Sequence, residues 1–301
     1  MASKHFQVVE VSPRDGLQNE AVPFTTRTKV LLIEACVAAG VDRIEAVSFV
    51  HPRLVPQMAD AEAVFEALSP EARSRAVGLV LNRRGLERAR SAGIEEVNVV
   101  VAATEGFAEA NQGTSRPALI EEAYSIIEDA RSAGLRAAAT ISVAFGCPFD
   151  GEVDPETVVE IARTLAMAGP IEIALGDTIG AAVPPQVTNL VKLASEAINP
   201  VPVRIHLHNT RNSGIANAWA ALEAGVRIFD ASMGGIGGCP FAPKATGNIS
   251  TEDLVWMATR SGYACNLDLA KTEPIREMLE DRLGRKVPSM VAQAGPFPAP
   301  S

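Results

Sequence analysis

The segment SAGIEEVNVVVA, residues 91 to 102, contains the transition that organises the whole chain. Gly93 follows the amphipathic stretch 84–92, and a glycine at a helix C-terminus readily adopts the positive φ that ends a helix. Residues 96–102 then form a short β-branched run that is apolar on both faces, which is typical of a strand buried in a parallel sheet. A helix, a glycine cap and a buried strand therefore define a structural unit.

The same alternation of β-branched runs and amphipathic stretches occurs eight times along the chain. Glycine also ends the helical stretches at Gly40, Gly134, Gly169 and Gly225. The expected strands are 6–11, 43–49, 76–81, 96–102, 137–145, 171–177, 201–208 and 227–233. The expected helices are 26–39, 58–67, 84–92, 117–133, 155–168, 185–197, 213–224 and 251–261. This pattern predicts an α/β fold, the (β/α)8 TIM barrel. An open doubly wound sheet is the alternative, but no GxGxxG turn follows the first strand.

The chain continues for about 40 residues beyond the last expected barrel helix. We expect a barrel domain over residues 1–262 and a C-terminal helical extension over 263–301, with one more helix at 273–284. The proline-rich end, PFPAP, is expected to be poorly ordered.

The composition excludes several classes of protein. Lys and Arg total 27 against 36 Asp and Glu, so a net charge of -9 gives no general support for nucleic-acid binding. Apolar runs are far shorter than the roughly 20 residues of a membrane span, and the N-terminus resembles neither a secretion signal nor a transit peptide. The four cysteines show no CxxC spacing or dense framework. We therefore expect a cytoplasmic protein, in which a local basic pocket could still bind an anionic small molecule.

Polar residues follow several of the expected strands at the end where barrel enzymes place their active sites. They are Arg14, Asp15, Gln18 and Glu20 after the first strand, Glu45 on the second, Asp177 on the sixth, His206 and His208 on the seventh, and Cys239 and Asn248 after the eighth. Taken singly, each has an ordinary structural explanation, such as a turn, a helix cap or a small buried side chain. Their placement on one rim predicts an active site.

Two of the four histidines stand one residue apart in HLHNT, residues 206 to 210. Side chains alternate along a strand, so His206 and His208 point to the same side. They are either polar residues at a strand end or two ligands of one ion. With the Asp15 carboxylate and the Asn248 carbonyl oxygen they form a mixed nitrogen and oxygen set, which suits Mg²⁺ or Mn²⁺ better than structural zinc. Such a set leaves two octahedral positions open, which a hydroxyl beside a carbonyl or carboxylate could fill.

The runs VVEVSPRDGLQNE, IEAVSFVHPRLVPQM, LGDTIG, HLHNT and GGIGGCPFAPKATGN resemble the 3-hydroxy-3-methylglutaryl-CoA lyase family, which belongs to a superfamily of metal-dependent lyases and synthases. The resemblance covers residues 6 to 260. It implies retro-Claisen cleavage of an acyl-CoA to acetyl-CoA and acetoacetate, as in leucine degradation and ketone-body formation. It also implies a homodimer, Asp15, His206, His208 and Asn248 as metal ligands, Arg14 as the substrate-polarising arginine and Cys239 as the catalytic cysteine.

Retro-Claisen chemistry needs a base for the hydroxyl proton, a cation to acidify that hydroxyl, a stabiliser for the thioester enolate and an acid for its carbon. His206 and Asp15 are alternative bases, and Arg14 suits the enolate oxygen because its charge is permanent and its donors are directed. The family resemblance gives Cys239 the role of acid. Glu45 and Asp177 are expected to orient the residues that contact the ion.

The sequence departs from the family pattern where lyases of this family read HxHDTYGQ and this chain reads HLHNTRNS. Asn209, Arg211 and Asn212 change there, and Arg211 is a candidate, with Arg14 and Gln18, for substrate binding. Arg83, Arg84 and Lys244 are candidate contacts for the CoA diphosphate. The departure keeps citramalyl-CoA, which would give pyruvate, as an alternative substrate. A Claisen-type synthase and a non-catalytic binding barrel are the alternatives from other classes.

Overall fold

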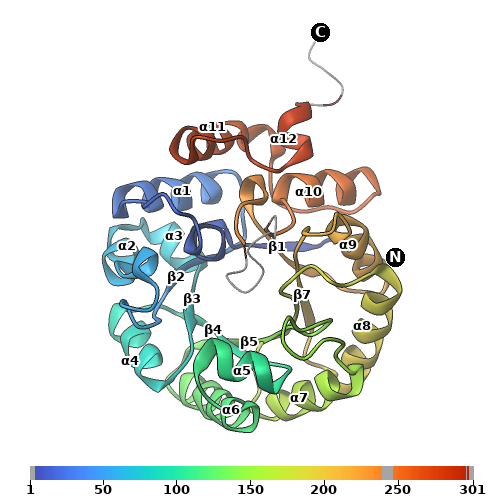
Figure 1. Cartoon of the computed structure of the whole chain (residues 1–301). Coiled ribbons are helices and arrows are strands. Elements are labelled where there is room, and N and C mark those ends of the chain that lie inside the picture. The colour runs from blue at the N-terminus through green and yellow to red at the C-terminus, as the bar shows by residue number, and fades with distance from the viewer. Residues whose placement is uncertain (1–3, 239–246, 296, 298–301) are drawn as a thin grey trace.

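The eight strands close into a parallel barrel in the order in which they occur in the chain (Figure 1). The structure is a computed structural model, and it describes residues 4–238, 247–295 and 297. The strands are β1 Gln7–Glu10, β2 Arg43–Ser48, β3 Ala76–Val80, β4 Glu96–Ala102, β5 Arg136–Ser142, β6 Ile173–Asp177, β7 Val203–Leu207 and β8 Ile228–Ala231. β1 pairs with β8 with Gln7 opposite Ile228, which closes the ring and confirms the predicted fold.

The helices form an outer ring around the strands (Figure 1). They are α1 Thr26–Ala38, α2 Ala61–Ala67, α3 Pro70–Arg75, α4 Arg83–Ala92, α5 Glu105–Gln112, α6 Arg116–Ser132, α7 Pro155–Met167, α8 Pro184–Ile198, α9 Gly214–Glu223 and α10 Thr251–Arg260. α11 Glu273–Leu283 and α12 Met290–Ala294 lie outside α1 and α10. Among the described residues, no helix is long and apolar enough to cross a membrane.

Several short helices were missed, and each has a local cause. The stretch expected as one helix over 58–67 is a 3-10 turn, Pro56–Met58, followed by α2, and α3 begins at a Ser69 cap with proline next. The loop after β4 contains α5, which is capped by Thr104 and ends at Gly113, where φ is +67°. A short polar helix over a cavity lacks the length that makes periodicity recognisable.

Two strands end at least two residues earlier than predicted. β5 was expected to reach residue 145, but Val143 has a φ of +51°, which no strand residue adopts. β8 was expected to reach residue 233, but the 3-10 turn Met233–Gly235 turns the chain over the barrel mouth. Both strand ends therefore turn toward the rim that was predicted to carry the site. The expectation for the last residues lies largely outside the described part of the chain.

The five predicted glycine caps all have positive φ, between +77° at Gly169 and +105° at Gly225. Gly40 has a second constraint, because a Cβ added there would overlap the backbone carbonyl oxygen of Asn266, from the segment that leads into the C-terminal helices. Gly225 has a similar φ of +105°, but nothing lies within 4 Å of a Cβ added there. A comparison of substitutions at the two positions therefore distinguishes the cost of a positive φ from the cost of a steric overlap.

We expect Gly40→Ala to destabilise the protein more than Gly225→Ala. Gly225→Ala should lower the free energy of unfolding by about 1–2 kcal/mol through its positive φ alone, and Gly40→Ala by about 1–3 kcal/mol more, because the backbone at Asn266 must move. Urea unfolding of both variants measures the difference. Equal losses of unfolding free energy in the two variants would show that the backbone at Asn266 moves without an energetic cost.

Candidate functional site

The two histidines of β7 and an aspartate of the first loop meet at the carboxyl end of the barrel. Asp15 lies in the π-helical turn Ser12–Gly16 that follows β1. Nitrogen or oxygen atoms of Asp15, His206 and His208 all lie within 4.8 Å of one another, and the two Nε2 atoms are 3.1 Å apart. The predicted same-side placement of the histidines is therefore observed. The described residues contain this one group of three acidic, histidine or cysteine side chains that could hold a metal ion.

The protonation of this group differs from residue to residue. Burial, reinforced by the positive charge of His206, lowers the pKa of His208 to about 3, so His208 is neutral near pH 7. Burial would raise the pKa of Asp15, but the Arg14 guanidinium and the histidines outweigh it and lower the pKa to about 2. Burial likewise opposes the charge on His206, yet its hydrogen bond and ion pair with Asp230 raise the pKa. A neutral imidazole beside an ionised carboxylate matches the ligand states that divalent metals require.

Asp15, His206 and His208 together are called the ligand group below. Asn248 lies beside this group, as predicted. Its Nδ2 donates to Asp15 Oδ2 at 2.8 Å and to the carbonyl oxygen of Ile236 at 3.2 Å, and its backbone forms a bridge with His208. The side-chain amide is therefore fixed with its nitrogen toward Asp15. The carbonyl oxygen of the same amide forms no hydrogen bond with the described residues.

Arg14 and Glu45 form an ion pair next to the ligand group. Arg14 Nε contacts Glu45 Oε1, and Nη1 donates to Asp15 Oδ1 at 2.7 Å. The other oxygen of Glu45 accepts from Asn98 Nδ2 at 3.0 Å. Arg14 Nη2 has no hydrogen-bond partner within the described part of the chain, so one directed donor of a fixed guanidinium remains for a ligand.

The other predicted site residues are placed differently. Asp177 accepts from the backbone N–H groups of Ala181 at 2.7 Å and Ala182 at 3.2 Å, and burial raises its pKa to about 6. It therefore shapes the loop after β6, and it makes no hydrogen bond to Asp15 or the histidines in the described structure. Arg211 donates to the carbonyl oxygens of Ile179 and Gly180, both at 2.9 Å, on that same loop.

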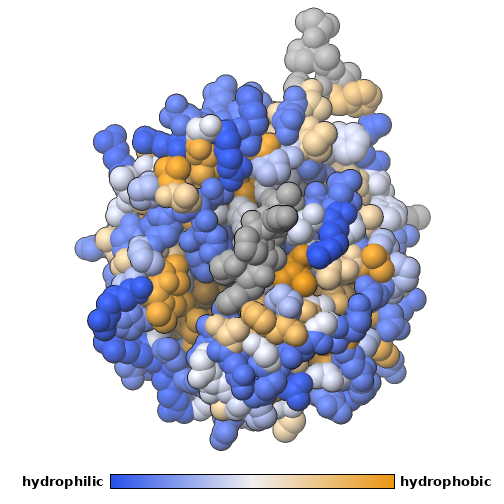
Figure 2. All heavy atoms as spheres, viewed as in Figure 1, coloured by the Kyte–Doolittle hydropathy of each residue, from blue (hydrophilic) through white to orange (hydrophobic). Residues whose placement is uncertain are grey.

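The site residues form the base of a cavity of about 740 Å³, large enough for a cofactor-sized ligand. Gln18 lines it, and its Oε1 is buried without a hydrogen-bond partner in the described structure. Val50, Leu54 and Phe107 add apolar surface to the wall, and Figure 2 shows hydrophobic residues gathered near the centre of this face. Arg211 is not among the lining residues. The cavity is polar at its base, and its wall combines these apolar side chains with polar ones such as Asn82 and Gln112.

Residues expected to bind CoA or donate a proton are only partly described. Arg83 contacts Ser125 and lies 3.4 Å from Asp129 of α6, on the outer surface, and Arg84 is exposed. Cys239 and Lys244 lie outside the described residues. The last described residue before these is Gly238, which lines the cavity and whose carbonyl oxygen accepts from Asn19 Nδ2 at 3.0 Å. Glu20, also noted in the sequence, pairs with Arg285 of the C-terminal region.

Sequence reasoning missed the residues that support the site from below. Asp230 of β8 lies 3.1 Å from His206 Nδ1, and Arg204 of β7 lies 3.4 Å from the other Asp230 oxygen. Both were visible as charged residues within apolar strands, and strand alternation places Arg204 on the same side as His206. The sequence did not indicate which charges pair, because the partners come from strands far apart in the chain.

Two further buried carboxyl groups, also missed, hold the start of the loop after β8. Glu10 accepts from the backbone N–H of Met233 at 2.9 Å, and Glu252 accepts from Gly234 N–H at 2.9 and 3.0 Å and from Ser250 Oγ at 2.6 Å. Burial, aided by the charge of Glu10, raises the pKa of Glu252 to about 7. The loop that leads to Cys239 is therefore anchored on groups that do not contact the cavity.

The fold and this group of two histidines and a carboxylate at the rim define a barrel with a candidate metal centre, and comparisons with known proteins give its family. A family model described as HMGL-like matches residues 5–279. The (R)-citramalyl-CoA lyase of Chloroflexus aurantiacus is 45% identical over 96% of this chain and 94% of that protein. The hydroxymethylglutaryl-CoA lyase of Pseudomonas mevalonii is 40% identical over 92% of each chain. The chain belongs to the HMGL-like family.

A solved structure extends the comparison to a ligand-bound relative. The HMG-CoA lyase from Acinetobacter baumannii, in complex with coenzyme A and 3-methylmalate, superposes with a TM-score of 0.94 at 37% identity, covering 100% of this chain and 98% of that one. The architecture around the site is therefore shared over the whole described barrel.

We expect Glu252→Gln to reduce the dependence of stability on pH. The folded-state pKa of Glu252, about 7, lies above its ordinary value of 4.5. The protonated carboxyl group therefore makes its full contribution to the free energy of unfolding below about pH 4.5, and this contribution is lost as pH rises through 7. At about 1.4 kcal/mol per pKa unit, the wild type should lose roughly 3 kcal/mol across this range. Glutamine keeps the acceptor but does not titrate.

Urea unfolding of wild type and Glu252→Gln at pH 5 and pH 8 measures this difference. The variant should lose about 2–3 kcal/mol less than the wild type between the two pH values. Parallel stability curves for the two proteins would contradict the assignment.

Proposed function

We propose that this protein is a divalent-metal-dependent lyase that cleaves a 3-hydroxy-3-methyl acyl-CoA to acetyl-CoA and an oxo acid. The bond between C2 and C3 of the acyl group breaks, the C3 hydroxyl loses its proton to become the carbonyl of the oxo acid, and C2 gains a proton to become the methyl group of acetyl-CoA. The observation that carries the proposal is the ligand group of Asp15, His206 and His208 beside the fixed Arg14, at the base of a cavity in an HMGL-like barrel.

The residues present fit a divalent cation. Two imidazole nitrogens each about 2.1 Å from an ion, and at right angles around it, are about 3 Å apart, and the Nε2 atoms of His206 and His208 are 3.1 Å apart. Nδ1 of His206 is hydrogen-bonded to Asp230, and this bond leaves Nε2 facing Asp15 and His208. Asn248 offers a carbonyl oxygen as a fourth donor. When bound, Mg²⁺ or Mn²⁺ supplies Lewis acidity to a hydroxyl that it contacts.

The remaining steps use side chains of this chain. Asp15 takes the proton of the substrate hydroxyl, because Nδ1 of His206 is bonded to Asp230 and its Nε2 would hold the ion. Arg14 directs Nη2 to the thioester oxygen, which gains negative charge as the bond between C2 and C3 breaks. Cys239, beyond the described Gly238 at the cavity wall, protonates C2. Gln18 offers a buried acceptor to the substrate.

Two acyl groups are the candidate substrates, and they differ by one methylene. The identity of 45% with a citramalyl-CoA lyase favours citramalyl-CoA, with pyruvate as the second product. The identity of 40% with a hydroxymethylglutaryl-CoA lyase supports 3-hydroxy-3-methylglutaryl-CoA as the second candidate. The departure at 209–212 does not decide between them, because Arg211 contacts backbone carbonyls and does not line the cavity. We also propose a homodimer, on the family resemblance.

The test is release of acetyl-CoA by the purified protein with Mn²⁺ or Mg²⁺, with both CoA esters offered in parallel. We expect cleavage that a chelator abolishes, with the larger kcat/KM for citramalyl-CoA. A preference for hydroxymethylglutaryl-CoA would reverse the order of the two substrates but keep the reaction. If neither ester is cleaved by folded protein with Mn²⁺ bound, the proposed function is wrong.

We expect His208→Ala to weaken Mn²⁺ binding by at least about 100-fold, since loss of a direct ligand should exceed the 10–100-fold effect of outer residues. His5→Ala is the matched control, because His5 is exposed and lies at the opposite end of the chain's first strand. Titration of Mn²⁺ followed by electron paramagnetic resonance measures both. An unchanged affinity in folded His208→Ala would remove His208 from the metal site.

A further inference from the structure

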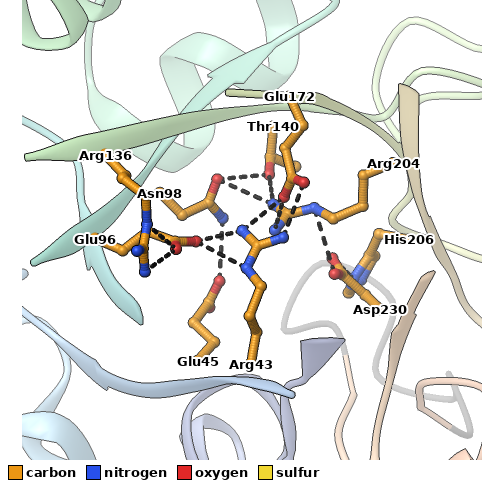
Figure 3. Close-up of polar contacts among 10 residues, drawn as sticks. All are labelled: Arg43, Glu45, Glu96, Asn98, Arg136, Thr140, Glu172, Arg204, His206 and Asp230. Atoms are coloured by element: carbon orange, nitrogen blue, oxygen red, sulfur yellow. Dashed lines mark hydrogen bonds and ion pairs between the residues drawn. The ribbon is translucent and has the colours of Figure 1, made fainter. Parts of the chain in front are cut away.

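A network of buried charges crosses the barrel interior directly below the site. Figure 3 draws ten of its residues: Arg43, Glu45, Glu96, Asn98, Arg136, Thr140, Glu172, Arg204, His206 and Asp230. They come from β2, β4, β5, β7 and β8 and, for Glu172, from the residue before β6, so the network spans most of the barrel. TIM-barrel interiors are usually filled by branched apolar side chains. A charged interior of this extent therefore requires an explanation.

Arg204 is the residue of this network that contacts the support of the ligand group. Its exposed fraction is 0%, and its Nε lies 3.4 Å from Asp230 Oδ1. The other oxygen of Asp230 lies 3.1 Å from His206 Nδ1. Glu172 holds the opposite side of the guanidinium, with Oε1 2.9 Å from Nη1. Arg204 thus forms an ion pair, without a hydrogen bond, with the carboxylate that orients His206.

The remaining nitrogen of Arg204 points to the other side of the site. Nη2 donates to Asn98 Oδ1 and to Thr140 Oγ1, both at 3.1 Å, and Thr140 Oγ1 donates to Asn98 Oδ1 at 3.0 Å. With its oxygen held, Asn98 directs Nδ2 to Glu45 at 3.0 Å, and Glu45 pairs with Arg14. Nη2 of Arg204 is therefore connected to Arg14 through Asn98 and Glu45.

Arg43 shows that burial alone does not create this connection. It pairs with Glu96 and with both oxygens of Glu172, at 2.8 Å each for the latter, in the same interior. Arg43 forms no hydrogen bond or ion pair with Asp230, Asn98 or Thr140 in the described structure, whereas Arg204 contacts all three. The two arginines that share Glu172 thus differ in whether they contact the residues that support the site.

We propose that Arg204 is a positioning residue that fixes His206 and Arg14 relative to each other from below the site. The planar guanidinium contacts Asp230 through Nε and the pair of Asn98 and Thr140 through Nη2. Because these nitrogens belong to one rigid group, His206 and Arg14 are kept at a fixed distance from each other. This deepens the proposed function and rests on it for the reaction, although the arrangement of the ligand group can be tested without any substrate. Arg204 touches neither the cavity nor the ligand atoms, so its effect is indirect.

The test compares Arg204→Met with Arg43→Met, each of which removes one positive charge of the barrel interior that pairs with Glu172. We expect Arg204→Met to weaken Mn²⁺ binding about 10–100-fold, the range for residues that orient metal ligands, and to lower kcat at saturating Mn²⁺ by at least about tenfold, with KM for the CoA ester within about threefold. Arg43→Met should keep the Mn²⁺ affinity within about threefold of wild type. Circular dichroism and urea unfolding establish that each variant is folded.

The proposal is overturned if folded Arg204→Met keeps Mn²⁺ affinity and kcat within about threefold of wild type, or if both methionine variants lose Mn²⁺ affinity equally. Removing one partner of a buried pair strongly destabilises proteins, so Arg204→Lys and Arg43→Lys replace the methionine variants if those do not fold. Lysine keeps the charge but cannot hold Asp230 and Asn98 together, so Arg204→Lys should still lose at least about tenfold in kcat. A wild-type kcat in folded Arg204→Lys also overturns the proposal.

The Mn²⁺ titrations keep this test separate from the proposed function. If the wild type binds Mn²⁺ but cleaves neither CoA ester, the proposed function fails, while the affinities of the two methionine variants still decide the role of Arg204.

Discussion

The ion pairs inside the barrel are the constraint on which the rest of the structure depends. Arg43 and Arg204 are compensated by Glu96, Glu172 and Asp230, and each partner comes from a different part of the chain. Buried charges without partners are strongly unfavourable, so these residues are tolerated only when all the contributing strands are in register. Closure of the barrel and formation of the polar base of the site are therefore the same event.

The site above this network holds its residues in defined charge states. A neutral His208, an ionised Asp15 and a His206 held by Asp230 lie within one small group. Their states follow from burial and from the neighbouring Arg14 and Asp230, which are themselves fixed by the interior network. Carboxyl groups of β1 and α10 hold the loop after β8 from the other side. The rim is thus rigid on the side of the ligand group, where precise spacing matters most.

Membership of the HMGL-like family and the geometry of the ligand group support a reaction type, whereas the substrate depends on finer features. The sequence departure at 209–212 drew attention to Arg211, but its guanidinium is occupied by two backbone carbonyls of the loop after β6. Residues that do reach the cavity base, such as Asn98 and Thr140, are already hydrogen-bonded among themselves. For the proposed reaction, we expect selection between two acyl groups that differ by one methylene to rest on cavity shape as well as on charge.

The sequence by itself determined the barrel, the glycine caps and the placement of His206 and His208 on one side of their strand, because each of these follows from local periodicity, backbone conformation or strand alternation. The short helix α5 and the early end of β5 at Val143 were not predictable in this way, since a brief polar helix and a single positive φ leave no periodic signal. Only the tertiary structure decided that Arg204 pairs with Asp230 and Asn98, and that Arg14 pairs with Glu45. Arg204 and Asn98 are separated by 106 residues, so their contact exists only once the sheet has closed. Local patterns specify which face a side chain occupies, whereas the choice of a buried charge partner depends on distances that the closed barrel alone fixes.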